Sequence, residues 1–279
     1  MNVPAPRSFT RADSDAVYAL ADADSPLGLK VQDALNIIDK ALADYGQHHL
    51  ALSFNGGKDC QSTRTGFVTL ERSSLFDSTP GTVLIHLLAA SFFRSLPPST
   101  TPLIKCVYVR CSAPFPQVEA FVTICTQRYH LDLSAVDGSM KEALGEYIDQ
   151  RKGDANGAIQ AILVGTRRGD PHGATLKPFE KTDHGWPDFM RVHPILDWTY
   201  SEIWDFLRDP TLTLGGGRQE WCELYDYGYT SLGSTHNTFP NPLLKATDDP
   251  NVLGGWRPAW ELQDESQERA GRGIPPVEP

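Results

Sequence analysis

Several features that would identify other classes of protein are missing from this sequence. The 279 residues carry a formal charge of −10, which argues against non-specific binding to nucleic acid or anionic membranes. The longest apolar run, residues 83–93, includes His86 and is too short to span a bilayer. A basic-then-apolar signal sequence is also absent from the first residues. We therefore expect a monomeric cytoplasmic protein whose partners are small molecules, not nucleic acid or membranes.

Cysteine and nucleophile patterns are equally sparse. The five cysteines are scattered and form no C-x-x-C pair, so neither a zinc site nor a disulfide framework is indicated. The Walker A pattern G-x-x-x-x-G-K-[ST] is absent. No Ser/His/Asp or Cys/His arrangement for covalent catalysis is evident either. The informative segments are instead rich in glycine, arginine and aromatic residues.

Apolar periodicity predicts alternating helices and strands from residue 31 onward. We expect helices at 31–45, from 82 to Pro97, at 118–129, at 140–150 and at 201–208, the last capped by Thr199. We expect buried strands at 50–54, 103–109, 131–136, 161–165 and 192–196. This alternation predicts an α/β fold with a mainly parallel twisted sheet, helices on both faces, and ligands at the carboxyl ends of the strands.

The domain boundaries follow composition. Residues 1–28 are rich in proline and aspartate and are expected to form a flexible or loosely docked arm, followed by an α/β domain over 29–250. Residues 61–81 are polar, rich in Ser and Thr, and read as an insertion within that domain. The tail, 251–279, carries Arg269 and Arg272, and on composition alone such a terminal charge run is usually solvated.

The first candidate site is the glycine loop that follows the expected strand at 50–54. In Ser53-Phe54-Asn55-Gly56-Gly57-Lys58-Asp59-Cys60, the two glycines allow backbone N–H groups to converge on an anion. Lys58 adds a positive charge, and Asp59 can orient it or bind Mg²⁺. An ordinary turn is the alternative interpretation.

The second candidate site follows the expected strand at 161–165. In Gly165-Thr166-Arg167-Arg168-Gly169-Asp170-Pro171, two adjacent arginines can grip a phosphate, and Asp170 can orient an arginine or a substrate hydroxyl. Because the carboxyl ends of parallel strands share one edge, both candidate sites are expected on the same rim. A solvated turn is the alternative.

Aromatic residues lie beside carboxylates farther along the chain. The loop with Asp183, Trp186, Asp188, Phe189 and Arg191 suits an aromatic ligand stacked on a ring. A second segment, 225–234, is rich in Tyr, Ser and Thr and could equally be a packing loop. We interpret His193, which precedes a proline, as a structural hydrogen-bonding residue rather than a base.

Together these motifs resemble the eukaryotic, fungal-type FMN adenylyltransferase (FAD synthetase) family, which is similar to the PAPS reductase group. The resemblance rests on four ordered segments: 53–60, 165–171, 186–194 and 225–234. It implies a Rossmann-like adenine nucleotide alpha hydrolase (PP-loop) fold. It also implies a reaction of MgATP with FMN that gives FAD and pyrophosphate, catalysed by positioning and electrostatics.

The resemblance also implies residue roles. Asn55, Lys58, Asp59, Arg168 and Asp170 would be catalytic, with Asp59 as a Mg²⁺ ligand. ATP would bind at Ser53, Phe54, Asn55, Gly56, Gly57, Lys58, Asp59, Gly165 and Arg167, with Arg110 and Phe115 lining the adenine pocket. FMN would bind at Asp183, Trp186, Asp188, Arg191, Arg269 and Arg272, because in this family the tail arginines fold back on the active site.

The segment 61–81 departs from the family pattern, in which the glycine loop runs straight into a helix. Our hypothesis is a retained intron or gene-model error, with a real surface loop as the alternative. Because the segment separates the loop from its helix, it is expected to weaken the anion site. Two other functions stay open: a PAPS reductase-like sulfonucleotide enzyme, without the usual C-terminal cysteine motif, and a non-catalytic nucleotide- or flavin-binding protein disabled by the insertion.

Overall fold

The structure is a computed structural model that describes residues 6–54, 78–154, 157–212, 221–246 and 252–273. Its α-helices are α1 (Arg11–Ala21), α2 (Pro26–Tyr45), α3 (Ser78–Ser95), α4 (Pro116–Arg128), α5 (Met140–Arg151) and α6 (Tyr200–Leu207). The strands are β1 (Leu50–Ser53), β2 (Ile104–Arg110), β3 (Leu131–Asp137), β4 (Ala161–Leu163), β5 (Phe179–Lys181) and β6 (Met190–Val192). Short 3₁₀ helices follow: η1 (Glu223–Tyr227), η2 (Pro242–Leu244), η3 (Leu253–Gly255), η4 (Ala259–Glu261) and η5 (Glu265–Gln267).

The strands form one six-stranded sheet in the order β3-β2-β1-β4-β6-β5. β1 pairs in parallel with β2 on one side and β4 on the other, and only β5 runs antiparallel, against β6. The chain therefore winds from β1 outward through β2 and β3 and then returns to the other side of β1. Such a reversal of strand order opens a crevice at the carboxyl ends of the two diverging strands, here β1 and β4. The predicted mainly parallel α/β fold is confirmed.

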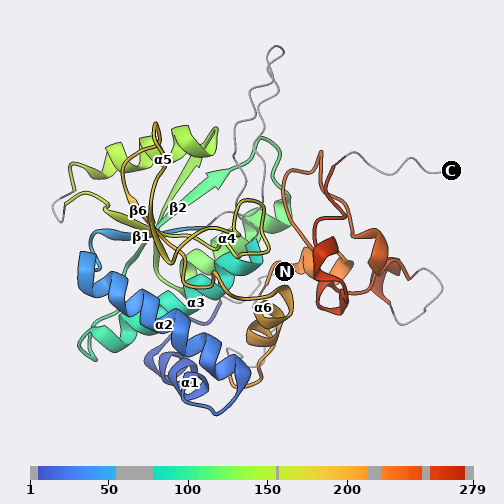
Figure 1. Cartoon of the computed structure of the whole chain (residues 1–279), viewed down its shortest axis with the longest axis horizontal. Helices are drawn as coiled ribbons and strands as arrows, with labels where there is room; N and C mark the ends of the chain where they lie inside the picture. Colours follow the sequence, from blue (N-terminus) through green and yellow to red (C-terminus); the bar gives the residue numbers. More distant parts are fainter. Residues whose placement is uncertain (1–5, 55–77, 155–156, 213–220, 247–251, 274–279) are drawn as a thin grey trace.

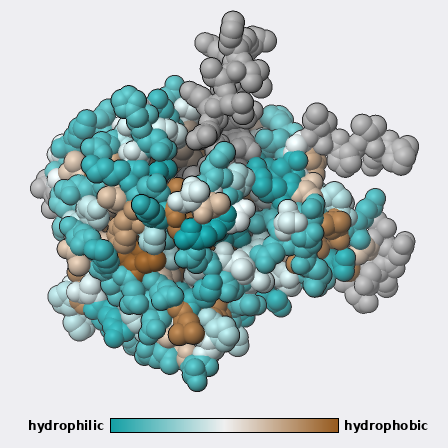
Figure 2. Space-filling view, viewed as in Figure 1, coloured by the Kyte–Doolittle hydropathy of each residue, from teal (hydrophilic) through white to brown (hydrophobic). Residues whose placement is uncertain are grey.

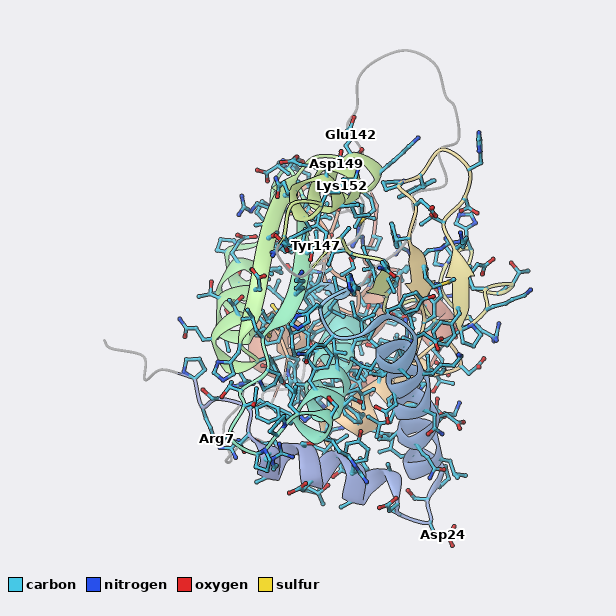
Figure 3. The ribbon with its side chains drawn as sticks, turned by 90° about the vertical axis from the view of Figure 1, so that its left-hand side faces the viewer. Arg7, Asp24, Glu142, Tyr147, Asp149 and Lys152 are labelled. Atoms are coloured by element: carbon cyan, nitrogen blue, oxygen red, sulfur yellow. The ribbon has the colours of Figure 1, made fainter. Side chains whose placement is uncertain are left out.

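Side-chain alternation along the central strands builds one core on each face of the sheet. Leu50, Leu52 and Phe54 of the β1 segment enter the larger core, whereas Ala51 between them enters the smaller one. α5 covers the smaller core, and α2, α3 and α4 lie on the opposite side of the sheet (Figure 1). In Figure 3, Tyr147 lies between α5 and the sheet, and Glu142, Asp149 and Lys152 mark the outer side of that helix.

The prediction of a loosely docked arm over residues 1–28 is wrong for residues 6–28. Residues 11–21 form α1, which packs on α2 and α3, and α2 already begins at Pro26 after the Ser25 cap. Phe9, 1% exposed, packs edge-on against His86 of α3 with ring centroids 5.0 Å apart. We overlooked this helix because aspartates and alanines dilute its apolar stripe, of which Val17 and Ala21 are buried.

Two strands near the sheet edge also differ from expectation. The last parallel strand is β6 at 190–192, not 192–196, and residues 193–196 leave the sheet in a turn. β5 was not predicted at all. A three-residue edge strand shows too little alternation to be recognised, and its pairing with β6 comes from the hairpin that joins them. By contrast, the cap at Thr199 is confirmed, with Thr199 and Glu202 forming a reciprocal capping box.

The C-terminal region, which we define as residues 221–246 and 252–273, lies beside the carboxyl-end side of the α/β core and is drawn in orange and red in Figure 1. Its aromatic residues anchor it to α6: Trp204 packs edge-on against Tyr225, Trp221 and Trp260 at centroid distances of 5.3, 5.7 and 5.5 Å. Aromatic packing is therefore one of the contacts that hold this region to the core.

The surface is mainly polar. Hydrophilic residues dominate the face shown in Figure 2, in keeping with the charge of −10. Among the helices that the structure describes, none has the length and apolar character that crossing a bilayer would require.

Candidate active site

The site is defined by the rim of the sheet at the carboxyl ends of β1, β2 and β4. Ser53 and Phe54, at the end of β1, are buried, and the Phe54 amide donates to Val107 O of β2 at 2.9 Å. The predicted phosphate-binding residues come next, and Asn55, Gly56, Gly57, Lys58 and Asp59 all lie outside the described residues. The described chain ends here at Phe54, beside the switch point between β1 and β4.

Helix α3 lies against the end of β1 despite the insertion. A Cβ on Gly81 would lie only 3.0 Å from the Phe54 ring, so the first turns of α3 pack directly on the residue that precedes the glycine loop. The helix begins at Ser78, earlier than expected, so the predicted boundary of the insertion at residue 81 is wrong. Separation along the sequence has not moved this helix away from the rim.

Arg167 is part of a buried ion-pair network rather than an open phosphate site. Its guanidinium, 4% exposed, contacts Asp170 Oδ1 at 2.9 Å, and Glu268 Oε1 and Oε2 at 2.8 and 2.7 Å. Its amide N–H donates to Asp170 Oδ2 at 2.8 Å. Asp170 therefore orients an arginine, one of the two roles considered for it. The ATP contact predicted for Arg167 is not supported by these surroundings.

Arg168, the neighbouring residue, lies in a different environment. Its guanidinium pairs with Asp197 and donates to the carbonyl oxygens of Ala174 and Leu176 at 3.3 and 3.1 Å. The side chain is 44% exposed. Arg167 and Arg168 therefore contact different partners in this structure, and the expectation that they grip one phosphate together stays a prediction. Arg168 alone can still meet a phosphate if it releases Asp197, and its catalytic role stays a prediction.

The β2 end of the rim carries a small depression lined by Tyr108, Cys111, Phe115 and Gly233. The Arg272 guanidinium lies against Gly233, because a Cβ on Gly233 would be 2.2 Å from Arg272 Nη2. A larger residue at position 233 would force that guanidinium to move. Burial raises the pKa of the Cys111 thiol, and the Arg272 charge partly offsets the increase. A tail arginine thus reaches the strand that the resemblance assigned to ATP.

Of the two residues predicted to line the adenine pocket, Phe115 belongs to this depression and packs edge-on against Tyr229 at 5.6 Å. Arg110 is directed elsewhere, since it pairs with Glu119 at 3.5 Å and Asp137 at 3.4 Å. Tyr108 also donates to Glu119, at 2.5 Å, and burial together with this bond raises the pKa of the Tyr108 hydroxyl. Arg110 thus pairs with the same carboxylate as Tyr108, which lines the depression together with Phe115.

The tail crosses the rim between these two places. Glu268 meets Arg167 just after β4, and Arg272 lies against Gly233, which lines the depression together with Cys111 just after β2. In the sheet, β1 lies between β4 and β2. Residues 268–272 therefore pass the end of the strand that delivers the glycine loop. Two strand spacings amount to about 10 Å, which five residues can span.

The predicted flavin loop lies on the α5 side of the sheet. It joins β5 to β6, and Trp186 packs against the smaller core. Arg191 Nη1 lies 3.6 Å from Asp183 Oδ2, and Arg191 Nη2 donates to Lys181 O at 2.9 Å. The Asp188 side chain is 85% exposed, and its Oδ1 lies 3.9 Å from Lys181 Nζ. A Cβ on Gly185 would lie 3.7 Å from Lys141 Nζ in the first turn of α5, which follows the carboxyl end of β3.

His193 follows β6 and is fully buried. Burial and, to a smaller extent, the Arg191 charge lower its pKa to about 4, against an opposing effect of the Val164 backbone. The imidazole is therefore neutral at pH 7 and a poor proton acceptor. This argues against the role of a base. Neither ring nitrogen has a hydrogen-bond partner among the described residues, so the predicted hydrogen-bonding role is not confirmed.

Known proteins are similar to this chain over most of its length. The model of the phosphoadenosine phosphosulfate reductase domain matches residues 76–240. A probable FAD synthase of Schizosaccharomyces pombe is 38% identical over 86% of this chain and 77% of its own length. The chain belongs to the FAD synthase family. A probable FAD synthase of Caenorhabditis elegans is 32% identical over 87% of this chain but only 40% of its own length.

A solved structure supports the fold of this FAD synthase family member. The FMN adenylyltransferase of Candida glabrata superposes with a TM-score of 0.69 over 95% of this chain and 98% of its own, at 24% identity. The recognition from four motifs is thus confirmed, and the family is one of nucleotidyltransferases. The sulfonucleotide alternative is not favoured, because the relatives that match most of the chain are FAD synthases.

Sequence reasoning missed several residues that organise the site. Glu268 directly precedes Arg269, yet only the tail arginines were considered. Asn241, fully buried, donates to Thr230 Oγ1 at 2.9 Å and to Gln267 O at 2.8 Å. Thr230 in turn donates to Glu268 O at 2.5 Å. The sequence offers no local signal for this network, because Glu268 is one of several carboxylates in the same tail.

A metal site is not evident in the part of the chain that the structure describes, where no group of three or more His, Cys, Asp or Glu residues could hold an ion. The predicted Mg²⁺ ligand, Asp59, is outside that part. Its role stays a prediction.

Proposed function

We propose that this chain transfers AMP from ATP to FMN, giving FAD and pyrophosphate. An oxygen of the FMN phosphate forms a bond to the α-phosphorus of ATP, and the bond between that phosphorus and the bridging oxygen to the β-phosphate breaks. Both electrons of the broken bond leave with pyrophosphate. No proton has to be removed from the nucleophile, because a phosphate monoester is already ionised at neutral pH.

One observation carries the proposal: the tail crosses the carboxyl ends of β4 and β2, on either side of the strand that precedes Asn-Gly-Gly-Lys-Asp. Two substrates with multiple negative charges must meet in the reaction, and convergent backbone N–H groups and arginines can neutralise them. We propose that residues 55–58 bind the ATP phosphates and that Arg269 and Arg272 bind the FMN phosphate. The flavin ring would lie at the Asp183–Trp186 loop.

Magnesium would enter with ATP as part of that substrate, and Asp59 is its proposed protein ligand. The ion would supply positive charge beside the leaving pyrophosphate. We also propose that the protein acts as a cytoplasmic monomer.

The direct test is to incubate the purified chain with FMN, MgATP and pyrophosphatase and to measure FAD by chromatography. We expect FAD to form in proportion to enzyme. Binding of ATP and FMN without FAD or pyrophosphate would instead select the non-catalytic alternative. Arg168→Ala should abolish the product if Arg168 contacts the reacting phosphates, and full activity in that variant would remove it from the site.

The insertion can be tested with boundaries taken from the structure. Because Gly81 packs on Phe54, a deletion that reaches residue 81 removes the first turn of α3. The deletion should therefore span residues 61–77 and leave α3 intact. The shorter deletion should raise FAD synthesis, and unchanged or lower activity would contradict a harmful insertion. Transcripts that show no shorter spliced form across codons 60–82 would reject the retained-intron hypothesis.

A further inference from the structure

We propose that Glu268 is a positioning residue for FMN: through Arg167 and Asp170 it fixes the tail arginines at the carboxyl-end rim of the sheet. The inference rests on the proposed function. It assigns roles to three charged residues, and it replaces the ATP contact first expected of Arg167 with a contact inside the protein.

Arg167, Asp170 and Glu268 form a network of charge-assisted hydrogen bonds that connects the turn after β4 to the tail, and we call this network the joint. A single Arg167 nitrogen, Nη2, meets both oxygens of Glu268 at 2.8 and 2.7 Å and Asp170 Oδ1 at 2.9 Å. All three side chains are largely shielded, with exposures of 4%, 14% and 16% for Arg167, Glu268 and Asp170. Charge-assisted bonds of this kind are short and directional, and water competes poorly for them when they are buried.

Both ends of the joint belong to elements that meet substrate in the proposed function. Asp170 and Arg167 form the turn after β4, where Asp170 also accepts the Arg167 amide. Glu268 is adjacent to Arg269 and four residues before Arg272. The backbone bond from Arg272 N to Arg269 O, 2.9 Å long, makes these residues one compact turn. A shift of Glu268 is therefore transmitted to both arginines.

Arg167 has two carboxylate neighbours and cannot bind phosphate without breaking contacts with both. Removing Glu268 would leave the Arg167–Asp170 pair intact on the rim. The two sides of the joint can therefore be tested separately: loss of the Glu268 carboxylate should release the tail while leaving the β4 turn in place.

The test compares Glu268→Gln, Glu268→Asp and the control Glu265→Gln in steady-state assays of FAD formation. Glu265 is in the same tail but accepts the Tyr200 amide at 2.7 Å, a bond that glutamine can also accept. We expect kcat/KM for FMN to fall about 10- to 100-fold in Glu268→Gln, because small misplacements of a binding group cost that much. The KM for ATP should stay within about twofold. Glu268→Asp should recover part of the loss, and Glu265→Gln should match the wild type.

Arg167→Met separates the two roles of that arginine. In the positioning role it reproduces the Glu268→Gln defect for FMN, and the double variant is no worse than the single ones. A selective increase in the KM for ATP in Arg167→Met, with normal FMN kinetics in Glu268→Gln, would overturn the proposal.

Hydrogen exchange provides a readout that does not need activity. The bonds from Phe239 N to Gly271 O and from Gly273 N to Asn237 O tie the tail to its neighbours at 2.8 and 3.1 Å. Glu268→Gln should speed amide exchange in residues 268–273 and leave β1, β2 and β4 unchanged. Unchanged exchange in 268–273 would overturn the proposal even if the wild-type chain made no FAD, a result that by itself would reject only the proposed function.

Discussion

The α/β core and the C-terminal region are stabilised by different kinds of contact. In the core, apolar residues alternate along β1, β2 and β4 and fill two layers between sheet and helices. In the C-terminal region, 3₁₀ helices of three to five residues are held by tryptophan rings, a buried asparagine and the Arg167–Glu268 pair. The core arises from patterns local in the sequence, whereas the C-terminal region depends on contacts between distant residues.

This difference between the two regions is visible in two adjacent arginines on the rim. Arg167 and Arg168 are adjacent, yet one is 4% exposed and the other 44%. Their environments differ because Glu268, far along the chain, meets the first and Asp197 the second. Local sequence thus places a charged pair on the rim, but the distant partner determines which of the two is buried.

The difference in stability between the two regions can be tested by making the same leucine-to-alanine substitution in each. Leu52 in β1 and Leu232 in the C-terminal region are both 0% exposed. Leu52→Ala should lower the free energy of unfolding by about 2–5 kcal/mol, because the central strand cannot collapse around the cavity. Leu232→Ala should cost less, since an irregular segment can relax. Chemical denaturation followed by circular dichroism measures both.

Equal losses in the two variants, with a single transition of unchanged steepness, would break the comparison. They would mean that the C-terminal region unfolds as one unit with the core. A smaller loss in Leu232→Ala, together with lower FAD synthesis, would support a region that matters to the site more than to global stability.

The sequence predicted most of the core and the place of the site. Helices α2, α4 and α5 and strands β1 to β4 follow expected apolar patterns, and Gly46 ends α2 with a φ of 76°. The glycine loop and the Gly165–Pro171 segment follow β1 and β4, so the rim was also predictable. These features depend on period and on end signals, which a single sequence contains.

What the sequence could not provide was the pairing of distant charges. The carboxylate that meets Arg167 is 101 residues away, and no local pattern distinguishes Glu268 from its acidic neighbours. The N-terminal helix was hidden for a similar reason: Phe9 and Val17 become recognisable as core residues only beside α3. Long-range complementarity is a property of the fold and not of any segment.

Low pH should destabilise the core before the C-terminal region, because the buried histidines of the described residues, His86 and His193, lie in the core. His86 lies between Phe9 and Phe206, and its Nδ1 is 3.0 Å from the Tyr129 hydroxyl. Burial is the main reason that its pKa falls from 6.5 to about 4; the Asp13 charge opposes this decrease and the Arg128 charge adds to it. His193 shows a similar decrease.

The direction in which stability changes with pH follows from proton binding. Between about pH 6.5 and pH 4 the unfolded chain takes up a proton that the folded His86 refuses, so the folded state loses stability as the pH falls. The full decrease corresponds to as much as about 3 kcal/mol for such a group. His86→Gln should therefore flatten the dependence of melting temperature on pH in this window. The exposed control His236→Gln should leave it unchanged, and identical profiles for wild type and His86→Gln would exclude His86 as its source.

The smallest effect is expected for a residue that serves the C-terminal region alone. Asn241 accepts from Leu243 N at 3.0 Å and donates to Thr230 and Gln267, so it ties η2 to the tail. Asn241→Ala should cost about 1–3 kcal/mol, the penalty for buried partners left unsatisfied. The cost should appear as faster amide exchange in residues 265–273, with the strands of the core unaffected. Asn36→Ala, at an exposed position of α2, is the matched control. If Asn241→Ala instead lowered protection evenly from β3 to the tail, the polar contacts of the C-terminal region would support the whole fold, and the division between the two regions would not hold.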